Sequence, residues 1–287
     1  MPTPPAPTDG PRTASSLTLH LTHLGVAPGD TLLVHTSLRS LGWVCGGDQT
    51  VVRALLDAIG PAGNLVVPTQ TMDNTDPSGW ENPPVPQAWW ETIRAESPPF
   101  DPALTPSAYM GRVPERVRTW PGAVRSPHPQ TSFAALGPRA AHLMHPHPLE
   151  SALGEASPLA RLEQADARVL LLGTGYDSCT AFHLAEYRVP RPTTATSSCA
   201  IRTPDGDRRW TTYTGVALDE SDFPALGADF EATGAVTVGR VGSATARLFP
   251  LPQAVAFATG WLVDHRQASE LRPNPHRAAG GDELPAT

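Results

Sequence analysis

The sequence predicts a single α/β domain with loop insertions, because short apolar runs alternate with amphipathic segments along most of its 287 residues. The first unit is a strand over Thr31–His35, a helix from Asp48 and a second strand over Asn64–Pro68, a βαβ-like pattern. A third apolar run, Val169–Leu172, ends in a Gly-Thr-Gly turn. Strands that end in glycine-rich turns are typical binding places for anionic ligands in α/β proteins.

Two helices flank the first strand. Apolar residues at helical spacing predict one helix over Leu17–Leu24 and another from an Asp48 N-cap to Ile59, where Gly60-Pro61 ends it. Between the first strand and the second helix lies His35–Gly47, a segment rich in hydroxyl groups and glycine. Glycine permits tight turns and close approach of the backbone to a ligand, so this segment is either a binding loop or a structural turn.

The rest of the chain is less regular. Thr69–Leu104 is Pro-rich and contains three tryptophans, and a connection of this length is either a functional loop or disordered. The tryptophans favour a folded surface. The further expected elements are a helix over Ser107–Trp120, a helical segment over Thr180–Glu186, strands over Trp210–Tyr213 and Thr237–Val241, and a helix over Ala254–His265.

The two ends of the chain differ from its centre. We expect residues 1–15 to be a disordered N-terminal tail and residues 269–287 a flexible C-terminal tail, around a domain spanning residues 16–268. The N-terminus lacks the basic and apolar regions of a signal peptide, and no run approaches the roughly 18 apolar residues of a membrane span. The three cysteines form no CxxC pair, which indicates a reducing compartment and hence the cytoplasm.

The charge of the chain excludes some partners. Its net charge is −7 and all 21 basic residues are Arg, scattered along the sequence rather than clustered. Nucleic acid is therefore not an expected partner, because phosphate binding needs a basic face. An acidic protein suits a cationic small substrate, although ordinary solubility is the simpler explanation of the charge.

Several histidines are candidates for chemistry. His183 and Glu186 are three residues apart, so a helix would place both on one face, where the carboxylate can orient the imidazole. The alternative is a surface ion pair. His35 ends the first strand and His128 lies between two prolines, and each is either a ligand-binding or a structural histidine.

Other polar clusters are weaker candidates. His142, His145 and His147 are interrupted by prolines and have no neighbouring Cys, so we predict no metal site there. Acidic residues gather in one loop around Asp73 and in a second loop around Asp219, where they either recognise amines or are simply solvated. The sequence contains no P-loop, no GxGxxG fingerprint and no GxSxG nucleophile elbow.

A series of short motifs is specific in its order and spacing, although each motif alone is weak. They are Gly29–Leu38, Gly42–Gly47, Gly63–Thr69, Phe100–Pro102, Gly111–Glu115, Arg125–Phe133, Ser157–Leu159, Leu171–Gly173, His183–Glu186, Gly239–Gly242 and Phe249. From about Leu17 to His265, the chain therefore resembles the aminoglycoside 3-N-acetyltransferase family. The resemblance implies a mixed-sheet α/β fold distinct from that of the GNAT acetyltransferases.

The resemblance also implies a reaction. The donor would be acetyl-CoA and the acceptor the 3-amino group of a 2-deoxystreptamine antibiotic, giving resistance, with no metal and with a monomer or homodimer as the working unit. An alkyl amine is mostly protonated near neutral pH, as the Lys reference pKa of about 10.4 shows, so the enzyme needs a base. His183 is the expected base. The alternatives are another aminocyclitol or a biosynthetic amine as acceptor, or a member that binds its ligands without turnover.

The resemblance assigns three groups of residues. The expected catalytic residues are His183, Glu186 and Asp219. Expected to hold the cofactor are His35, Thr36, Ser37, Leu38, Arg39, Ser40, Val44, Gly46, Gly47, Thr69, Ser132 and Phe133, with the Thr69 hydroxyl or a backbone N–H as a candidate oxyanion donor. Expected to bind the acceptor are Asp73, Asp76, Glu96 and Asp222.

The chain departs from the family at one position. Many relatives carry an acidic pair directly after the Trp-x-x-Tyr/Phe strand, where this chain has Thr214-Gly215. We expect Glu186 or Asp219 to take over the orienting role. The acceptor range is then expected to be narrow, or to centre on an unusual aminocyclitol.

Overall fold

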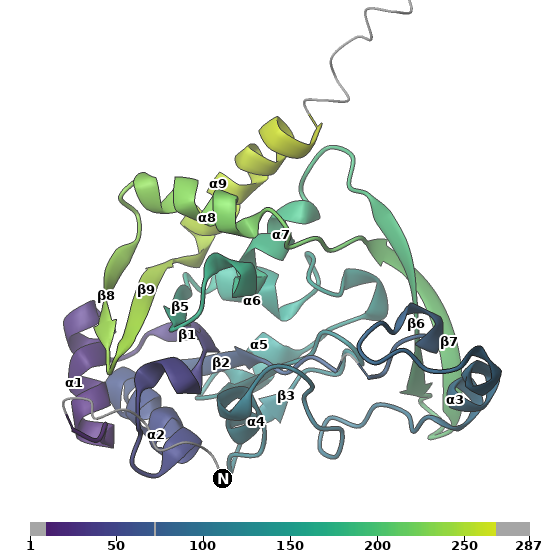
Figure 1. Ribbon diagram of the computed structural model, residues 1–287, viewed down its shortest axis with the longest axis horizontal. Coiled ribbons are helices and arrows are strands. Elements are labelled where there is room, and N and C mark those ends of the chain that lie inside the picture. Colours follow the sequence, from purple (N-terminus) through teal and green to yellow (C-terminus); the bar gives the residue numbers. More distant parts are fainter. Residues whose placement is uncertain (1–9, 72, 268–287) are drawn as a thin grey trace, which may run out of the picture.

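The computed structural model describes residues 10–71 and 73–267, and its centre is a mixed seven-stranded sheet (Figure 1). The strand order is β3-β4-β2-β1-β5-β9-β8. β1 runs parallel to β2 and β5, and the outer strands pair antiparallel, which confirms the predicted fold class. The strands are β1 (Thr31–Thr36), β2 (Asn64–Pro68), β3 (Val124–Arg125), β4 (Phe133–Leu136), β5 (Arg168–Leu172), β8 (Thr237–Val241) and β9 (Ala244–Pro250).

Helices cover both faces of this sheet, because its central strands are apolar on both sides. Leu32 and Val34 of β1 pack into one hydrophobic cluster, and Leu33 packs into the other. The first face carries α1 (Ala14–Leu24), α2 (Gly47–Ile59) and α4 (Arg112–Arg118). The second carries α5 (Ala140–Met144), α6 (Pro158–Gln164), α7 (His183–Glu186), α8 (Phe223–Ala232) and α9 (Leu251–Leu262).

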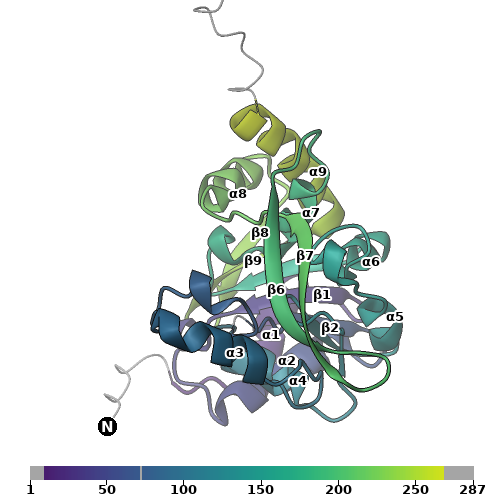
Figure 2. The ribbon, with the colours of Figure 1, turned by 90° about the vertical axis from the view of Figure 1, so that its right-hand side faces the viewer.

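A separate two-stranded ribbon lies beside the sheet and spans much of the height of the molecule (Figure 2). It pairs β6 (Thr194–Arg202) with β7 (Arg208–Val216) in antiparallel register. The Pro-rich insertion, which carries α3 (Trp90–Glu96), is fastened to the ribbon. The Asn74 side-chain amide and the Phe100 N–H both donate to the carbonyl of Ala200, at 3.0 and 3.1 Å. The insertion is therefore a folded loop, as its tryptophans indicated.

Some boundaries differ from those predicted. Asp48 lies in the first turn of α2, and the N-cap is Gly46, whose φ of 80° favours glycine. The helix expected over Ser107–Trp120 is only α4, because Gly111 at φ 84° precedes it and Glu115 accepts the hydrogen bonds of Ser107. The last helix starts earlier than expected, at Leu251, and continues into a π-helical turn, η7 (Val263–Gln267).

The N-terminal boundary of the domain was also wrong. Thr13 and Ser16 form a capping box at the start of α1, and Arg12 bridges to Val44, so residues 10–15 belong to the fold. The expected C-terminal tail, residues 269–287, lies outside the described residues. No helix in the described part of the chain is long and apolar enough to cross a bilayer.

Candidate active site

The three parallel strands end at one cavity of about 780 Å³. Thr36 at the end of β1, Pro68 at the end of β2 and Thr174 just after β5 all line it. The carboxyl ends of parallel strands meet at one edge of a sheet, which is where α/β proteins bind ligands. The Gly-Thr-Gly turn and the His35 segment therefore both contribute to the lining of this cavity.

His183 faces the cavity from the start of α7 and is paired with a carboxylate. Its Nδ1 lies 2.7 Å from Oε2 of Glu186, and the two side chains are only 12% and 3% exposed. A surface ion pair is thereby excluded. Because a carboxylate accepts hydrogen bonds, Nδ1 carries the hydrogen, and Nε2 of the neutral ring carries the lone pair. This tautomer suits a base that acts through Nε2.

Glu186 is itself held from two other elements. Its Oε1 accepts the backbone N–H of Asp219 at 3.1 Å and the guanidinium of Arg266 at 2.6 Å. Of the two expected orienting carboxylates, only Glu186 contacts the imidazole among the described residues. The carboxylate of Asp219 instead accepts hydrogen bonds from the side chain of Ser221 and from its N–H, the latter at 3.0 Å, and these lower the pKa of Asp219. Sequence reasoning did not identify Arg266, which lies 80 residues beyond Glu186.

His35 lines the same cavity but has a different environment. Its side chain is only 5% exposed, and burial, followed by the proximity of His183, lowers its pKa to about 3. An imidazole with so low a pKa is a weak base near neutral pH and is poorly matched to general-base catalysis there. The two cavity histidines therefore differ in chemistry, and His183 is the one suited to be the base.

The expected cofactor residues divide into two groups. His35 to Arg39 line the cavity as a continuous segment. Ser40 is turned away from it, with Oγ 3.0 Å from the carbonyl oxygen of Gly173, where it supports the turn after β5. Val44, Gly46 and Gly47 lie at and before the start of α2, outside the described lining of this cavity.

Thr69, Ser132 and Phe133 do not reach the cavity, contrary to expectation. Pro68 pairs with Phe133 across β2 and β4, and Thr69 donates its N–H to the carbonyl of Ser132 just beyond this pair, so all three residues are fully buried. Arg125 binds the hydroxyls of Ser132 and Thr69 at 3.0 and 3.2 Å. The oxyanion role suggested for Thr69 is therefore wrong, because its hydroxyl is held in this buried network.

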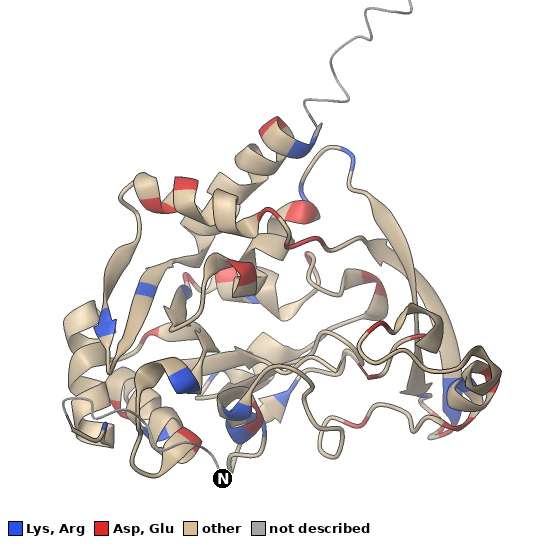
Figure 3. Ribbon diagram, viewed as in Figure 1, with Lys and Arg blue, Asp and Glu red and all other residues tan. Residues whose placement is uncertain are grey.

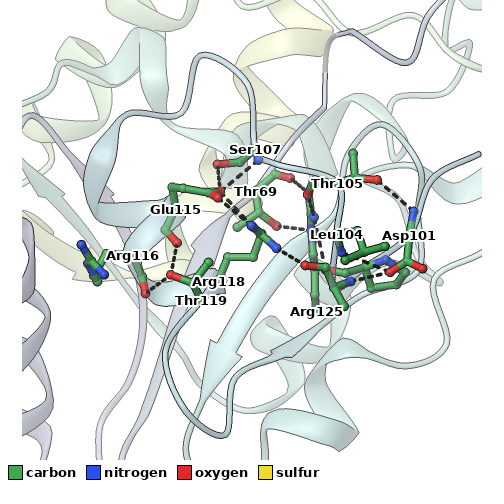
Figure 4. Close-up of polar contacts among 12 residues, drawn as sticks. Thr69, Asp101, Leu104, Thr105, Ser107, Glu115, Arg116, Arg118, Thr119 and Arg125 are labelled. Atoms are coloured by element: carbon green, nitrogen blue, oxygen red, sulfur yellow. Dashed lines mark hydrogen bonds and ion pairs between the residues drawn. The ribbon is translucent and has the colours of Figure 1, made fainter. Parts of the chain in front are cut away.

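Arg125 also belongs to a network that shapes one wall of the cavity (Figure 4). It binds the carbonyl of Thr105, while Glu115 accepts hydrogen bonds from Ser107 at 2.8 and 3.0 Å and pairs with Arg118 at 2.6 Å. Together these contacts fix the segment that leads into Tyr109 and Met110, which line the cavity.

The expected acceptor residues lie elsewhere in the described structure. Asp76 forms a two-bond ion pair with Arg94, at 2.8 and 2.9 Å, and Asp222 pairs with Arg266. Asp73 and Glu96 are exposed and are not part of the described cavity lining. The acidic side chains that line the cavity are Asp177 and Glu220. Glu220 belongs to a loop that the sequence singled out, and Asp177 follows the Gly-Thr-Gly turn.

The histidine-rich segment over residues 142–147, which begins within α5, provides no metal centre within the described residues. His147 is buried, with Nδ1 2.9 Å from the hydroxyl of Ser126 and Nε2 2.7 Å from the carbonyl of Ala152. His142 and His145 are exposed. His147 therefore has a structural role.

Comparison with known proteins places this arrangement in a family. The family model for aminoglycoside 3-N-acetyltransferase matches residues 33–263. YokD, a prophage-derived aminoglycoside N(3')-acetyltransferase-like protein of Bacillus subtilis, is 43% identical over 256 residues, which cover 89% of this chain and 94% of YokD. Its crystal structure has a TM-score of 0.89 at 42% identity and covers 91% of this chain and 96% of that one.

Two further relatives carry more specific names. Aminoglycoside N(3)-acetyltransferase IX of Micromonospora chalcea is 37% identical, over 88% of this chain and 94% of that protein. The structure of AAC-IIIb as a binary complex with CoASH has a TM-score of 0.79 at 31% identity, and covers 89% of this chain and 97% of that one. The chain therefore belongs to the aminoglycoside 3-N-acetyltransferase family of acyltransferase enzymes.

Proposed function

We propose that this protein transfers the acetyl group of acetyl-CoA to the 3-amino group of a 2-deoxystreptamine aminoglycoside, and so confers resistance to it. The observation that carries this proposal is the His183–Glu186 pair, whose imidazole lines the same cavity as the end of β1. A base and a candidate ligand-binding loop at the edge where three parallel strands end suit an amine acyltransferase. The CoASH complex of the related AAC-IIIb supports the choice of donor.

The charges of the cavity suit two ligands of opposite charge. Arg39 and Arg112 line it and can receive the phosphates of acetyl-CoA, whereas Asp177 and Glu220 line it and can receive ammonium groups. Figure 3 shows arginines on α4 and acidic residues on α7 and on the segment between β7 and α8, on opposite sides of the sheet's centre. We place the donor on the arginine side and the acceptor on the acidic side.

The reaction follows from the tautomer of His183. Nε2 takes a proton from the acceptor amine, whose nitrogen lone pair forms a bond to the carbonyl carbon of the thioester. The tetrahedral intermediate then collapses, the C–S bond breaks, and the sulfur of CoA leaves with the electron pair and takes a proton. Glu186 stabilises the imidazolium that forms in between, as an acceptor at Nδ1.

We infer a direct transfer without an acyl-enzyme. Cys179 is the cysteine nearest in sequence to His183, and its thiol is 1% exposed. Burial raises its pKa to about 12, so the reactive thiolate does not form at neutral pH. Cys45, which is exposed, is not among the residues that line the described cavity. Free cysteines also fit the proposed cytoplasmic location.

The test is thiol release from acetyl-CoA with a panel of 2-deoxystreptamine antibiotics, comparing the wild type with His183→Ala. General-base catalysis contributes about 10²–10⁴-fold, so the variant should lose that much turnover while keeping its melting temperature. Mass spectrometry should find one added acetyl group on the acceptor.

Other outcomes would overturn the proposal. Turnover only with amines outside this panel would change the acceptor class, and Thr214 in place of an acidic residue makes such a screen worthwhile. Calorimetric binding of CoA and aminoglycoside without thiol release would indicate a non-catalytic member. Near-normal turnover in His183→Ala would remove His183 as the base.

A further inference from the structure

The last helical turn of the described chain reaches into the catalytic pair. Arg266 lies in η7, after α9, and its Nη1 is 2.6 Å from Oε1 of Glu186. The other oxygen of this carboxylate, Oε2, contacts Nδ1 of His183. Arg266 and His183 are therefore bound to opposite oxygens of one carboxylate that is only 3% exposed.

The same guanidinium fastens a third segment, the turn between β7 and α8. Its Nε donates to Oδ2 of Asp222 at 2.7 Å, and Nη2 donates to the backbone carbonyl of Asp219 at 2.5 Å. Asp219 in turn donates its own N–H to Glu186. Arg266 thus joins η7, the β7–α8 turn and α7 in a closed set of hydrogen bonds around Glu186.

Arg266 also lies over the ring that packs on the base. Its Cζ is 6.0 Å from the centroid of Phe223, and that ring is centred 4.8 Å from the ring of His183. Phe223 and His183 side chains are buried or nearly so, so a shift of the guanidinium would be transmitted to the imidazole through packed atoms.

The charge balance of the cluster depends on this residue. Glu186 and Asp222 contribute two negative charges and Arg266 one positive charge, and these ion pairs raise the pKa of Arg266. Without Arg266, no cation would offset the negative charges of Glu186 and Asp222 in this set of contacts, and both charges would favour the protonated form of His183. The other titratable or charged groups around the pair are Asp219 on the β7–α8 turn, Tyr187 after α7, His35 on β1, Glu220 in the cavity and Arg191 near Glu186.

We propose that Arg266 is a positioning residue for catalysis, which holds Glu186 against His183 and offsets the negative charge of Glu186 and Asp222. This inference rests on the proposed role of His183 as the base. It assigns a function in the active site to the segment after α9, although Arg266 itself is not part of the cavity lining among the described residues.

The test compares Arg266→Met, which removes the charge at similar length, with Arg266→Lys, which keeps it. In Arg266→Met, kcat should fall by about 10²-fold, since small misplacements of catalytic groups have effects of this size. The KM for acetyl-CoA should change by less than about 3-fold, because Arg266 does not line the described cavity and its loss removes no binding contact there. The acid limb of kcat/KM should move by about one pH unit toward higher pH, because the unbalanced carboxylates favour the protonated pair.

Arg266→Lys should restore the acid limb and recover only part of kcat, because a lysine cannot bind both carboxylates in the same fork geometry. The matched control is Arg168→Met. Arg168 pairs with Asp30 at 3.0 Å at the start of β5, the opposite end of that strand from the cavity, so its loss should leave the pH profile unchanged.

A purely structural role would give a lower melting temperature and an unchanged pH profile for the folded fraction, and this result would overturn the proposal. NMR of ring-labelled His183 distinguishes a wrong positioning role for Arg266 from a wrong proposed reaction. The titration of its imidazole should move to higher pH in Arg266→Met and not in Arg168→Met, even if no acceptor is turned over. An unmoved titration would equally overturn the positioning role.

Discussion

His183 and His128 are both largely buried imidazoles with opposite hydrogen-bond partners. At His183, Nδ1 faces the Glu186 carboxylate, which can only accept, so Nδ1 carries the hydrogen. At His128, Nδ1 accepts the backbone N–H groups of Gln130 and Thr131, at 3.1 and 3.0 Å, so it must stay unprotonated. Its Nε2–H donates to the carbonyl of Leu149 at 3.2 Å.

Because of these partners, His183 and His128 differ in their ability to accept a proton. His128 has no exposed surface, and burial lowers its pKa to about 4. A proton on Nδ1 would also meet two N–H donors. His183 has a carboxylate that stabilises its protonated form, and it lies at a cavity where a ligand can deliver the proton. The two histidines thus differ in the partner of one ring nitrogen and in the access of a ligand to the other, and these two differences are what suit His183 to the proposed role of base.

We expect the largest effect from removing the charge of the carboxylate that contacts His183. Glu186→Gln keeps the size of the side chain but removes the charge that stabilises the imidazolium, and its amide can donate to the wrong ring nitrogen. We expect kcat/KM to fall by about 10²–10⁴-fold. Glu163→Gln on α6, which removes an ion pair to Arg188 in the turn after α7, is the control and should keep turnover. Equal losses in both variants, measured by thiol release, would contradict the role of Glu186.

A second prediction addresses the structural side through acid unfolding. The unfolded state binds a proton at His128 near pH 6.5, whereas the folded state binds it only near pH 4. The unfolded state therefore holds more protons in this window, and the free energy of unfolding should fall as pH drops from 6.5 to 4. His128 alone accounts for about 3 kcal/mol of this loss. Buried His147 and His35, whose pKa values are also lowered by burial, act in the same direction.

Urea unfolding between pH 4 and pH 7 measures this dependence. His128→Gln should be less stable at pH 7, because backbone groups of the loop lose their partner, and should show a shallower slope below pH 6.5. Its turnover per folded molecule should stay within about 2-fold of the wild type, since His128 is outside the cavity lining in the described chain. A slope as steep as that of the wild type would show that His128 titrates normally.

The smallest effect is expected at the two exposed histidines in and after α5, His142 and His145. His142→Ala should change the free energy of unfolding by less than about 0.5 kcal/mol and leave turnover unchanged. Chelator should likewise have no effect on either variant or wild type. A loss of melting temperature with chelator, absent in His142→Ala, would instead reveal a metal site at these histidines.

Local patterns predicted the parts of the fold that depend on local chemistry. The apolar runs located β1, β2 and β5, and the three-residue spacing located His183 and Glu186 on one short helix. Boundaries were less accurate where a glycine sets the start of a helix, as Gly46 does just before Asp48. The small outer strands β3 and β4 and the helix α5 carry too few residues for a periodic signal.

Residues far apart in the sequence explain the errors in the site. The resemblance placed Phe133 and Ser132, which end the Arg125–Phe133 motif, at the cofactor, but the antiparallel pairing of β4 with β2 buries them. Asp76 and Asp222 were assigned to the acceptor, but arginines at positions 94 and 266 bind them. These partners are 18 and 44 residues away, a separation at which no local pattern connects two side chains.

The sequence by itself determined the α/β class, the strand ends that form the cavity, the position of His183 and Glu186 on one helix face and the resemblance to the family. Each of these depends on residue type and on spacings of a few positions, which the backbone geometry of a strand or helix converts directly into position. Only the tertiary structure decided which carboxylate touches His183, that Arg266 supports it, and that Asp177 and Glu220 face the cavity. Those contacts join separate elements, and their geometry is set by how the elements pack.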